Sequence, residues 1–349
     1  MDPAMHVDPA TPAHAARSAA HHATAPRRLA SPARPASPRQ AATVLPATQW
    51  RAAARRHRAR IAERTDPLMS LHDDGRRHPV YDFLFTYYSQ SAGSLQRWHP
   101  GLGVVLADDP AGSAAAAEAE EFGQAPRGQW THYRRVAPDE HPDAPEGGWA
   151  VDAAAFAADR ATGIAFIREL LSRTAGREAH LGCFGLHEWA MAYRAEVHGV
   201  RHATVPLRLG TEGTNEVVES QRIRCTHFDA FRFFAPEARP LNEEQPTRKS
   251  MTAMEQPGCL HGNMDLHKWA GKLTPAIPSG LAADCFELAW EIREMDMMAS
   301  PYDLADWGFE PIRIETPAGR AEYVRRQRAF SERGQVLRSR LLEALAPLG

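Results

Sequence analysis

Residues that could carry chemistry are concentrated between positions 183 and 303. Three histidines there lie close in sequence to carboxylates or thiols. Asp229 follows His227 by two positions, a spacing that would place both side chains on one face of a strand, and Asp265 follows His261 by four, which would place both on one face of a helix. Imidazole and carboxylate groups act as general acids, general bases or metal ligands, so these pairs are the first candidates for a site.

The third histidine, His187, lies in the segment GCFGLHEWAMAYR. We predict a helix over residues 184–197, in which His187, Met191 and Arg194 share one face. Glu188 and Trp189 are turned away from that face by about 100° per residue. The segment begins like the zinc-protease motif H-E-x-x-H, but Met191 stands where the second histidine is needed, so that motif is excluded.

The pattern Cys-x-His occurs twice, at Cys225 and His227 and at Cys259 and His261. Thiolate and imidazole ligands suit zinc or iron. The residues therefore permit a zinc or iron site that acts on a small molecule, with ligands drawn from this set: His187, His227, His261, Asp265, Cys225 and Cys259. The alternative is structural, because isolated cysteines often fill apolar cores and buried histidines often pair with carboxylates.

A second chemical possibility is nucleobase binding, which uses aromatic stacking and hydrogen bonds to base edges. An aromatic block, YDFLFTYYS, spans residues 81–89, and Trp98 and Trp189 could add further stacking faces. The alternative for the block is the buried face of a strand or helix.

The elements that must position these residues are mainly helical. Helical periodicity predicts helices from Asp152, as the N-cap, to about Arg173, over 263–273, from Ser279 as a cap to about 298, and from Pro317 almost to the end. The Arg-rich stretch 49–64 predicts a basic helix, either a phosphate-contacting or a solvated one. Alternation and β-branching over 203–225 predict short strands, and residues 227–234 could form a strand or a helix. The composition of residues 107–128 predicts a loop insertion. The expected fold is mainly α with a small β element (α+β).

Composition limits the class of protein further. Residues 1–48 hold Ala, Pro, His, Ser and Arg with few large apolar side chains, which predicts a disordered tail before one globular domain over 49–349. The formal net charge is -2, so nucleic acid would have to bind at a local basic patch. The four cysteines are widely spaced, which favours reduced thiols. Neither a secretory signal nor a membrane span is recognisable, so we expect a cytoplasmic protein with no membrane partner.

Several strings together resemble an actinobacterial family commonly labelled 3-methyladenine DNA glycosylase. They are HPVYDFLFTYYS, RWHPGLGV, GCFGLHEWAMAYR, RIRCTHFDAFRFF, EQPGCLHGNMDLHKW and DCFELAWEIREMDMMASPYDL, and the resemblance covers roughly residues 50–335. It implies a DNA-repair hydrolase that flips an alkylated purine out of damaged DNA and hydrolyses its N-glycosidic bond without a cofactor.

For that base-excision reaction we expect Asp229 or Glu188 as the carboxylate near the sugar, with His187 or His227 orienting water. The candidate base-binding residues are Tyr81, Tyr87, Tyr88, Trp189, Phe231 and Arg232. The sequence thus leaves two hypotheses, a DNA glycosylase and a zinc or iron enzyme, and predicts no oligomeric state.

Overall fold

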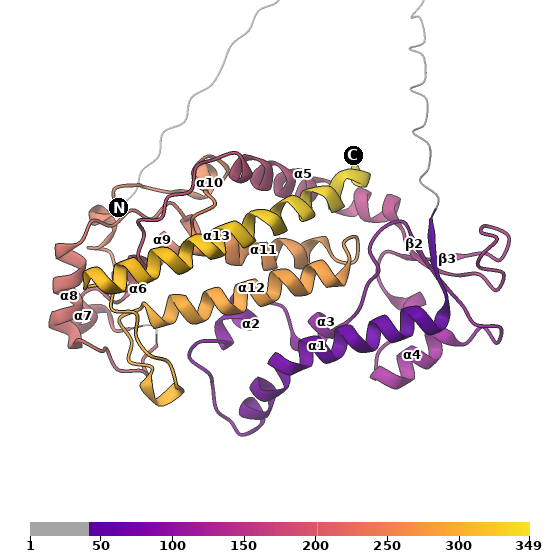
Figure 1. The fold of residues 1–349 in the computed structure, drawn as a ribbon, viewed down its shortest axis with the longest axis horizontal. Coiled ribbons are helices and arrows are strands. Elements are labelled where there is room, and N and C mark those ends of the chain that lie inside the picture. The colour runs from indigo at the N-terminus through magenta and orange to yellow at the C-terminus, as the bar shows by residue number, and fades with distance from the viewer. Residues whose placement is uncertain (1–41, 201) are drawn as a thin grey trace, which may run out of the picture. The chain divides into compact units, whose positions relative to one another are not determined.

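The computed structural model describes residues 42–200 and 202–349, and these described residues belong to one compact unit (Figure 1). This unit is mainly helical with one four-stranded sheet, which confirms the predicted fold class. Most of the predicted tail, residues 1–41, lies outside the described residues. Its predicted boundary at residue 48 is wrong, because Thr43–Leu45 form strand β1 and helix α1 begins at Ala47.

The core is built by α5 (Ala153–Ala175), α11 (Leu260–Leu273), α12 (Ser279–Met298) and α13 (Pro317–Leu345). Helix α11 packs against both α12 and α13, and α13 also packs against α5. Nearly every residue of α11 is buried, polar ones included, as expected for a helix surrounded on all sides. The polar residues of α11 must therefore find partners inside the protein.

Two of the predicted helix starts are confirmed by their caps. The Asp152 side chain accepts a hydrogen bond from the Ala155 backbone N–H at 2.9 Å, and Thr316 caps α13 in the same way just before Pro317. Ser279 is not a cap, because Pro278 holds that position. The Ser279 hydroxyl instead accepts from the backbone N–H of His99 at 2.8 Å, which ties α12 to a distant loop.

The predicted basic helix is the start of α1 (Ala47–Asp73). Its buried positions recur every three or four residues and form one face: Trp50, Ala54, His57, Ile61, Thr65 and Leu68. On the other side, Arg60 binds Asp284 at 2.6 Å and Glu287 at 2.7 Å, both on α12. Arg60, at least, therefore forms ion pairs within the protein.

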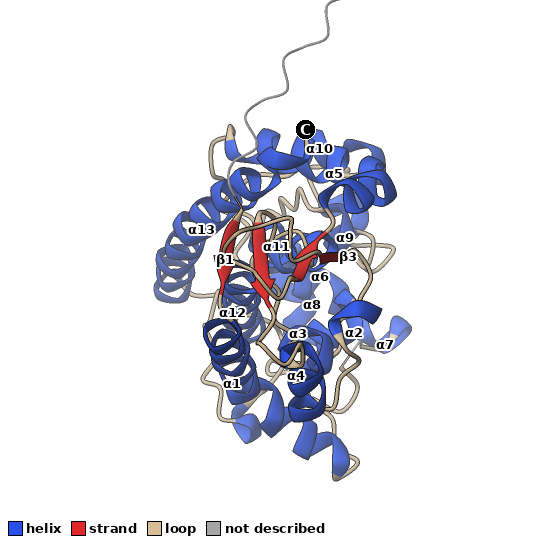
Figure 2. Ribbon diagram, turned by 90° about the vertical axis from the view of Figure 1, so that its right-hand side faces the viewer, coloured by secondary structure: helices blue, strands red, loops and turns tan. Residues whose placement is uncertain are grey.

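The sheet lies at one end of the unit and contains β1, β2 (Val104–Ala107), β4 (Gly148–Val151) and β3 (Tyr133–Val136), in that order (Figure 2). Strands β1 and β2 are parallel, and the other two pairs are antiparallel.

Two predicted segments are wrong. Residues 203–225 contain helix α8 (Gly210–Ser220) instead of strands; Thr214, Val217 and Val218 are buried at helical spacing, so packing overrides the strand propensity of β-branched residues. The predicted loop insertion at 107–128 contains α4 (Ala114–Phe122), whose Glu118 forms a buried ion pair with Arg127.

The other helices are short: α2 (Asp82–Tyr88), α3 (Ala92–Gln96), α6 (Leu186–Ala192), α7 (Ala195–His198), α9 (Phe228–Phe231) and α10 (Met251–Met254). Single 3₁₀ turns cover Arg127–Gln129, Arg239–Leu241, Arg248–Ser250, Ala305–Trp307 and Ala346–Leu348. The helix predicted over 184–197 is broken at Arg194, whose φ is 53°, so the expectation that Arg194 shares a face with His187 is wrong. In the described part of the chain, no helix combines the length and the apolar character needed to cross a membrane.

Candidate functional site

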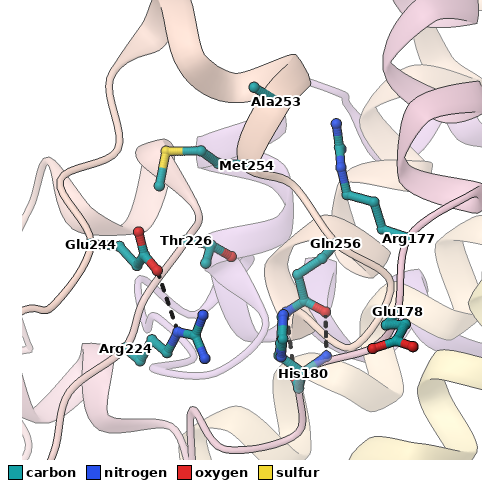
Figure 3. A pocket seen from close by; sticks show the side chains of 9 residues that line it. All are labelled: Arg177, Glu178, His180, Arg224, Thr226, Glu244, Ala253, Met254 and Gln256. Atoms are coloured by element: carbon teal, nitrogen blue, oxygen red, sulfur yellow. Dashed lines mark hydrogen bonds and ion pairs between the residues drawn. The ribbon is translucent and has the colours of Figure 1, made fainter.

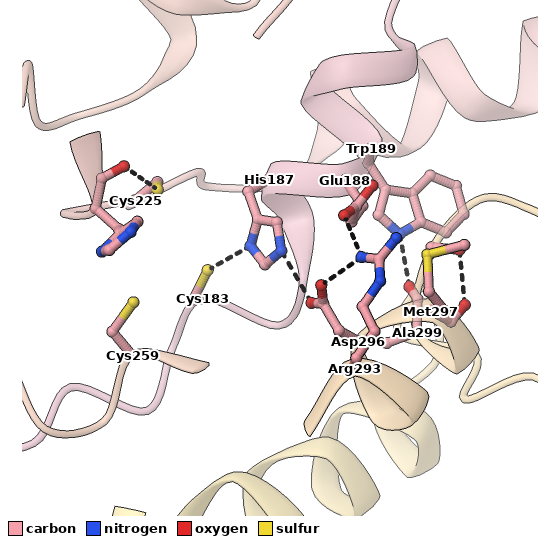
Figure 4. Close-up of polar contacts among 12 residues, drawn as sticks. Cys183, His187, Glu188, Trp189, Cys225, Cys259, Arg293, Asp296, Met297 and Ala299 are labelled. Atoms are coloured by element: carbon pink, nitrogen blue, oxygen red, sulfur yellow. Dashed lines mark hydrogen bonds and ion pairs between the residues drawn. The ribbon is translucent and has the colours of Figure 1, made fainter. Parts of the chain in front are cut away.

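A buried polar centre lies where α6, α11 and α12 meet. His187 of α6, His261 of α11 and Asp296 of α12 each offer one donor atom, and these three atoms lie within 4.8 Å of one another. The Nε2 atom of His187 lies 2.9 Å from the carboxylate of Asp296 (Figure 4). The rings of His187 and His261 meet edge to face, with their centroids 4.4 Å apart. His187 and Asp296, which are 109 positions apart in sequence, therefore lie in one site.

The turn before α6 sets the position of His187. Phe184 and Gly185 both have positive φ, at 50° and 70°, and a Cβ at Gly185 would lie 3.3 Å from the ring of Tyr323. This tight turn brings Cys183 back over the first turn of the helix, where its sulfur lies 3.5 Å from Nδ1 of His187. Both ring nitrogens of His187 are therefore engaged, one by a thiol and the other by a carboxylate.

The fully buried Arg293 forms ion pairs with two carboxylates of the site, Glu188 and Asp296. The guanidinium of Arg293 lies 3.0 Å from Glu188 and 3.3 Å from Asp296, and it also donates to the backbone oxygen of Val80. Burial alone would raise the pKa of Asp296, but His187 and Arg293 hold it well below its ordinary value. Burial alone would lower the pKa of His187, but Asp296 holds it well above its ordinary value.

A second group lies beside the first and contains His227, Asp229 and Asp265. The ammonium of Lys268 lies 3.1 Å from Asp229 and 3.4 Å from Asp265, so a cation already neutralises both carboxylates. A cation, Arg293, also pairs with Asp296 in the first group, but that group has side chains, His187 and His261, that line a cavity.

His227 and Glu255 form a buried pair that hydrogen bonds do not satisfy. The Nδ1 atom of His227 lies 3.7 Å from Glu255, too far for a hydrogen bond, and neither ring nitrogen has a partner among the described residues. Burial lowers the pKa of His227 to about 3. Burial, and then the charge of Asp265, raise the pKa of Glu255 to about 8. The pair is therefore held mostly in its uncharged forms at neutral pH.

Three adjoining hollows connect the first group with the surface. The innermost, about 10 Å³, is lined by residues that include Cys183, His187, Cys225, Cys259 and His261. A cavity of about 100 Å³ adjoins it, and an outer cleft of about 320 Å³ is lined by residues that include Arg177, Glu178 and Met254 (Figure 3). All three share Arg224, Thr226 and Gln256. The outer volume is that of a small-molecule site, and the innermost holds about one water.

The candidate metal ligands predicted from sequence do converge, but into different parts of the site. His187 and His261 belong to the first group, and His227 and Asp265 to the second. Cys225 and Cys259 line the innermost cavity instead. The pairing of His227 with Asp229 arises at the start of α9 rather than along a strand.

Three members of the site were missed from sequence: Cys183, Glu255 and Asp296. Asp296 stands between methionines on α12 and has no histidine or cysteine near it in sequence. No local spacing could have found it. The position of Cys183 four residues before His187 is a signal that could have been used.

The residues expected for base excision lie in other surroundings. Glu188 is paired with Arg293, and Asp229 is paired with Lys268 and with Arg232 at 3.1 Å. Both carboxylates therefore lie in ion pairs, which favours a structural role for them.

The aromatic candidates are packed rather than open. Trp189 is fully buried and donates to the backbone oxygen of Ala299 at 2.8 Å, and Tyr81 stacks on Trp290 and donates to Glu294 at 2.6 Å. Tyr88 and Phe231 are buried in the main core, and Tyr87 packs against it. No member of the predicted base-binding set lines the three hollows described above.

Comparison of the chain with protein-family profiles, curated proteins and solved structures finds no significant match. The class of protein is therefore defined by the fold and the site alone: a mainly helical protein with a buried histidine, carboxylate and thiol centre beneath a polar cleft.

Proposed function

We propose that the protein is a metal-dependent enzyme that acts on a small molecule, with zinc or iron held by His187, His261 and Asp296. The observation that carries the proposal is the convergence of these three donor atoms within 4.8 Å at the inner end of a cleft. Three protein ligands and one open position are the usual donor set of a catalytic zinc site, and two histidines with one carboxylate also suit non-haem iron.

The separation of His187 and Asp296 fits two ligands of one ion. Bonds of about 2.1 Å from a metal to a nitrogen and an oxygen place neighbouring ligands about 3.0 Å apart at the right angles of an octahedral site and about 3.4 Å apart at the tetrahedral angle. The observed distance from Nε2 to the carboxylate oxygen is 2.9 Å. His261 makes no hydrogen bond within the described ranges and lines the innermost cavity, so its ring is free to bind an ion there.

The surroundings would hold these ligands in place. A ligating histidine normally donates its second ring N–H to a neighbour, and Cys183 lies in that position for His187. Arg293 binds the other oxygen of Asp296 and fixes the carboxylate. A bound ion would supply Lewis-acid activation of a substrate or water. The outer cleft, with Arg224 and Gln256 at its inner side, would hold the small molecule.

The test is the metal content of the full chain, purified without chelators and measured by plasma mass spectrometry. We expect near-stoichiometric zinc or iron in the wild type and a loss of at least tenfold in affinity in His261→Ala and Asp296→Asn. His267→Gln is the matched control, because His267 is equally buried on the same helix but outside the three-residue group. It should retain the metal.

A wild-type protein that is folded by circular dichroism and takes up neither zinc nor ferrous iron would overturn the proposal. Equal loss of metal in His267→Gln and His261→Ala would overturn the assignment of ligands. DNA glycosylase activity, which the resemblance implies, stays a prediction.

A further inference from the structure

Three of the four cysteines come together in space. Cys183 precedes α6, Cys225 precedes α9, and Cys259 is the N-cap residue of α11, yet all three line the innermost cavity. Figure 4 shows their sulfur atoms around a common space. All are free thiols. The fourth, Cys285, is buried within α12 and lines none of the hollows described above.

Two of these sulfurs have polar neighbours in the cavity, and burial raises the pKa of the Cys225 and Cys259 thiols above its ordinary value. The Gly262 backbone N–H donates to Cys259 at 3.4 Å, and Nδ1 of His187 lies 3.5 Å from Cys183. Arg224 lines the same cavity and brings a positive charge. The hydroxyl of Tyr323, a fully buried residue that also lines it, has no hydrogen-bond partner among the residues described. A polar group left unpartnered in this way points to a bound group.

The spacing of the thiols argues against a single ion. Zinc–sulfur bonds of about 2.3 Å place two thiolates about 3.8 Å apart. Within the described part of the chain, the three sulfurs are not among the groups whose donor atoms all lie within 4.8 Å of one another. An inorganic core of several irons bridged by sulfide spaces its thiolates more widely. The adjoining cavity of about 100 Å³, which Cys183 also lines, gives more room than one ion needs.

We propose that Cys183, Cys225 and Cys259 hold an iron–sulfur cluster. Each thiol gives up its proton as its bond to iron forms. Because only three cysteines line the cavity, a cluster of four irons would keep one iron without a thiolate, on the side of the cavity that His261 and Tyr323 line. Such an iron can bind an oxygen or nitrogen atom of a small molecule that enters from the cleft. This site adjoins the proposed ion, because His187 and His261 line the same cavity, but the proposal rests on the thiols and not on that ion.

The experiment uses the full chain, reconstituted anaerobically with ferric iron, sulfide and a small thiol that reduces part of the iron. Protein-bound iron and acid-labile sulfide are measured chemically, and the cluster is followed by visible absorption and electron paramagnetic resonance. We expect comparable amounts of iron and sulfide in the wild type and in Cys285→Ala, the matched control. In Cys183→Ala, Cys225→Ala and Cys259→Ala, sulfide should fall at least threefold while circular dichroism stays unchanged.

Absence of acid-labile sulfide from the folded wild type would overturn the cluster, as would equal loss of sulfide in Cys285→Ala. Iron that is bound without sulfide and lost in His261→Ala would overturn the cluster and support the mononuclear site. Sulfide and iron that both persist unchanged in His261→Ala would support the cluster and count against the mononuclear site. The two proposals therefore fail separately.

Discussion

Replacing Glu188 by glutamine separates a structural from a catalytic role for this carboxylate. Glu188 and Arg293 are both almost fully buried, and their charged groups lie 3.0 Å apart. Removing one partner of a buried ion pair costs about 3–5 kcal/mol, because the other charge loses its compensation. Arg293 keeps Asp296 at 3.3 Å, so we expect the lower end of that range, a loss of about 3 kcal/mol in the free energy of unfolding.

The assay is urea denaturation at pH 7, followed by circular dichroism and tryptophan fluorescence. Glu291→Gln is the control. Glu291 lies on α12 and forms an ion pair with Arg333, but both of these side chains are exposed. Loss of an exposed pair costs about 0–1 kcal/mol. A loss in Glu188→Gln no larger than in Glu291→Gln would refute the reasoning. If Glu188 is instead the catalytic carboxylate, the variant should keep its stability and lose its activity.

Two further predictions concern His99 and Asp229. Burial, and then the charge of Arg127, lower the pKa of His99 to about 3, so the folded state binds its proton less readily than the unfolded state and stability is lost as the pH falls below about 6.5. His99 should therefore lower the free energy of unfolding by about 2 kcal/mol at pH 5 relative to pH 8. In urea denaturation the free energy of unfolding of His99→Gln should vary less with pH than that of the wild type. An equal variation in the two proteins would contradict the lowered pKa. If the protein is a glycosylase, the wild type should release 3-methyladenine from methylated DNA and Asp229→Asn should not; no release by the folded wild type would end that hypothesis.

The fold was predictable where the sequence carries local signals. Asp152 and Pro317 mark helix starts that depend on one hydrogen bond or one fixed dihedral angle, and both were found. Residues 210–220 were not, because β-branched valines favour strands locally while the burial of Val217 and Val218 on one helix face depends on neighbours far away in sequence.

The site was predictable only in part, for the same reason. His261 stands out because Cys259 precedes it by two positions and Asp265 follows it by four, and His187 because of its predicted helix face. Their distance from Asp296 depends on how α6, α11 and α12 pack, and no spacing along the chain encodes that packing. Helical spacing turned Glu188 away from the face of His187, and Glu188 was a candidate only as the carboxylate of base excision. In the structure Arg293, which no motif singled out, pairs with both Glu188 and Asp296.

His187 is the residue through which the thiols and the carboxylates of the site would influence each other. One ring nitrogen faces Cys183 and the other faces Asp296. If Cys183 carries a cluster thiolate, the Nδ1–H group of His187 donates to it, and a metal beside Asp296 would take the place of the proton that Asp296 otherwise holds on Nε2. Loss of the thiolate would weaken the hydrogen bond that fixes this tautomer. Cys183→Ala should therefore weaken binding at the His187 site as well, whereas Cys225→Ala, which removes a thiol hydrogen-bonded to the backbone oxygen of His227 and not to His187, should remove sulfide but spare that site.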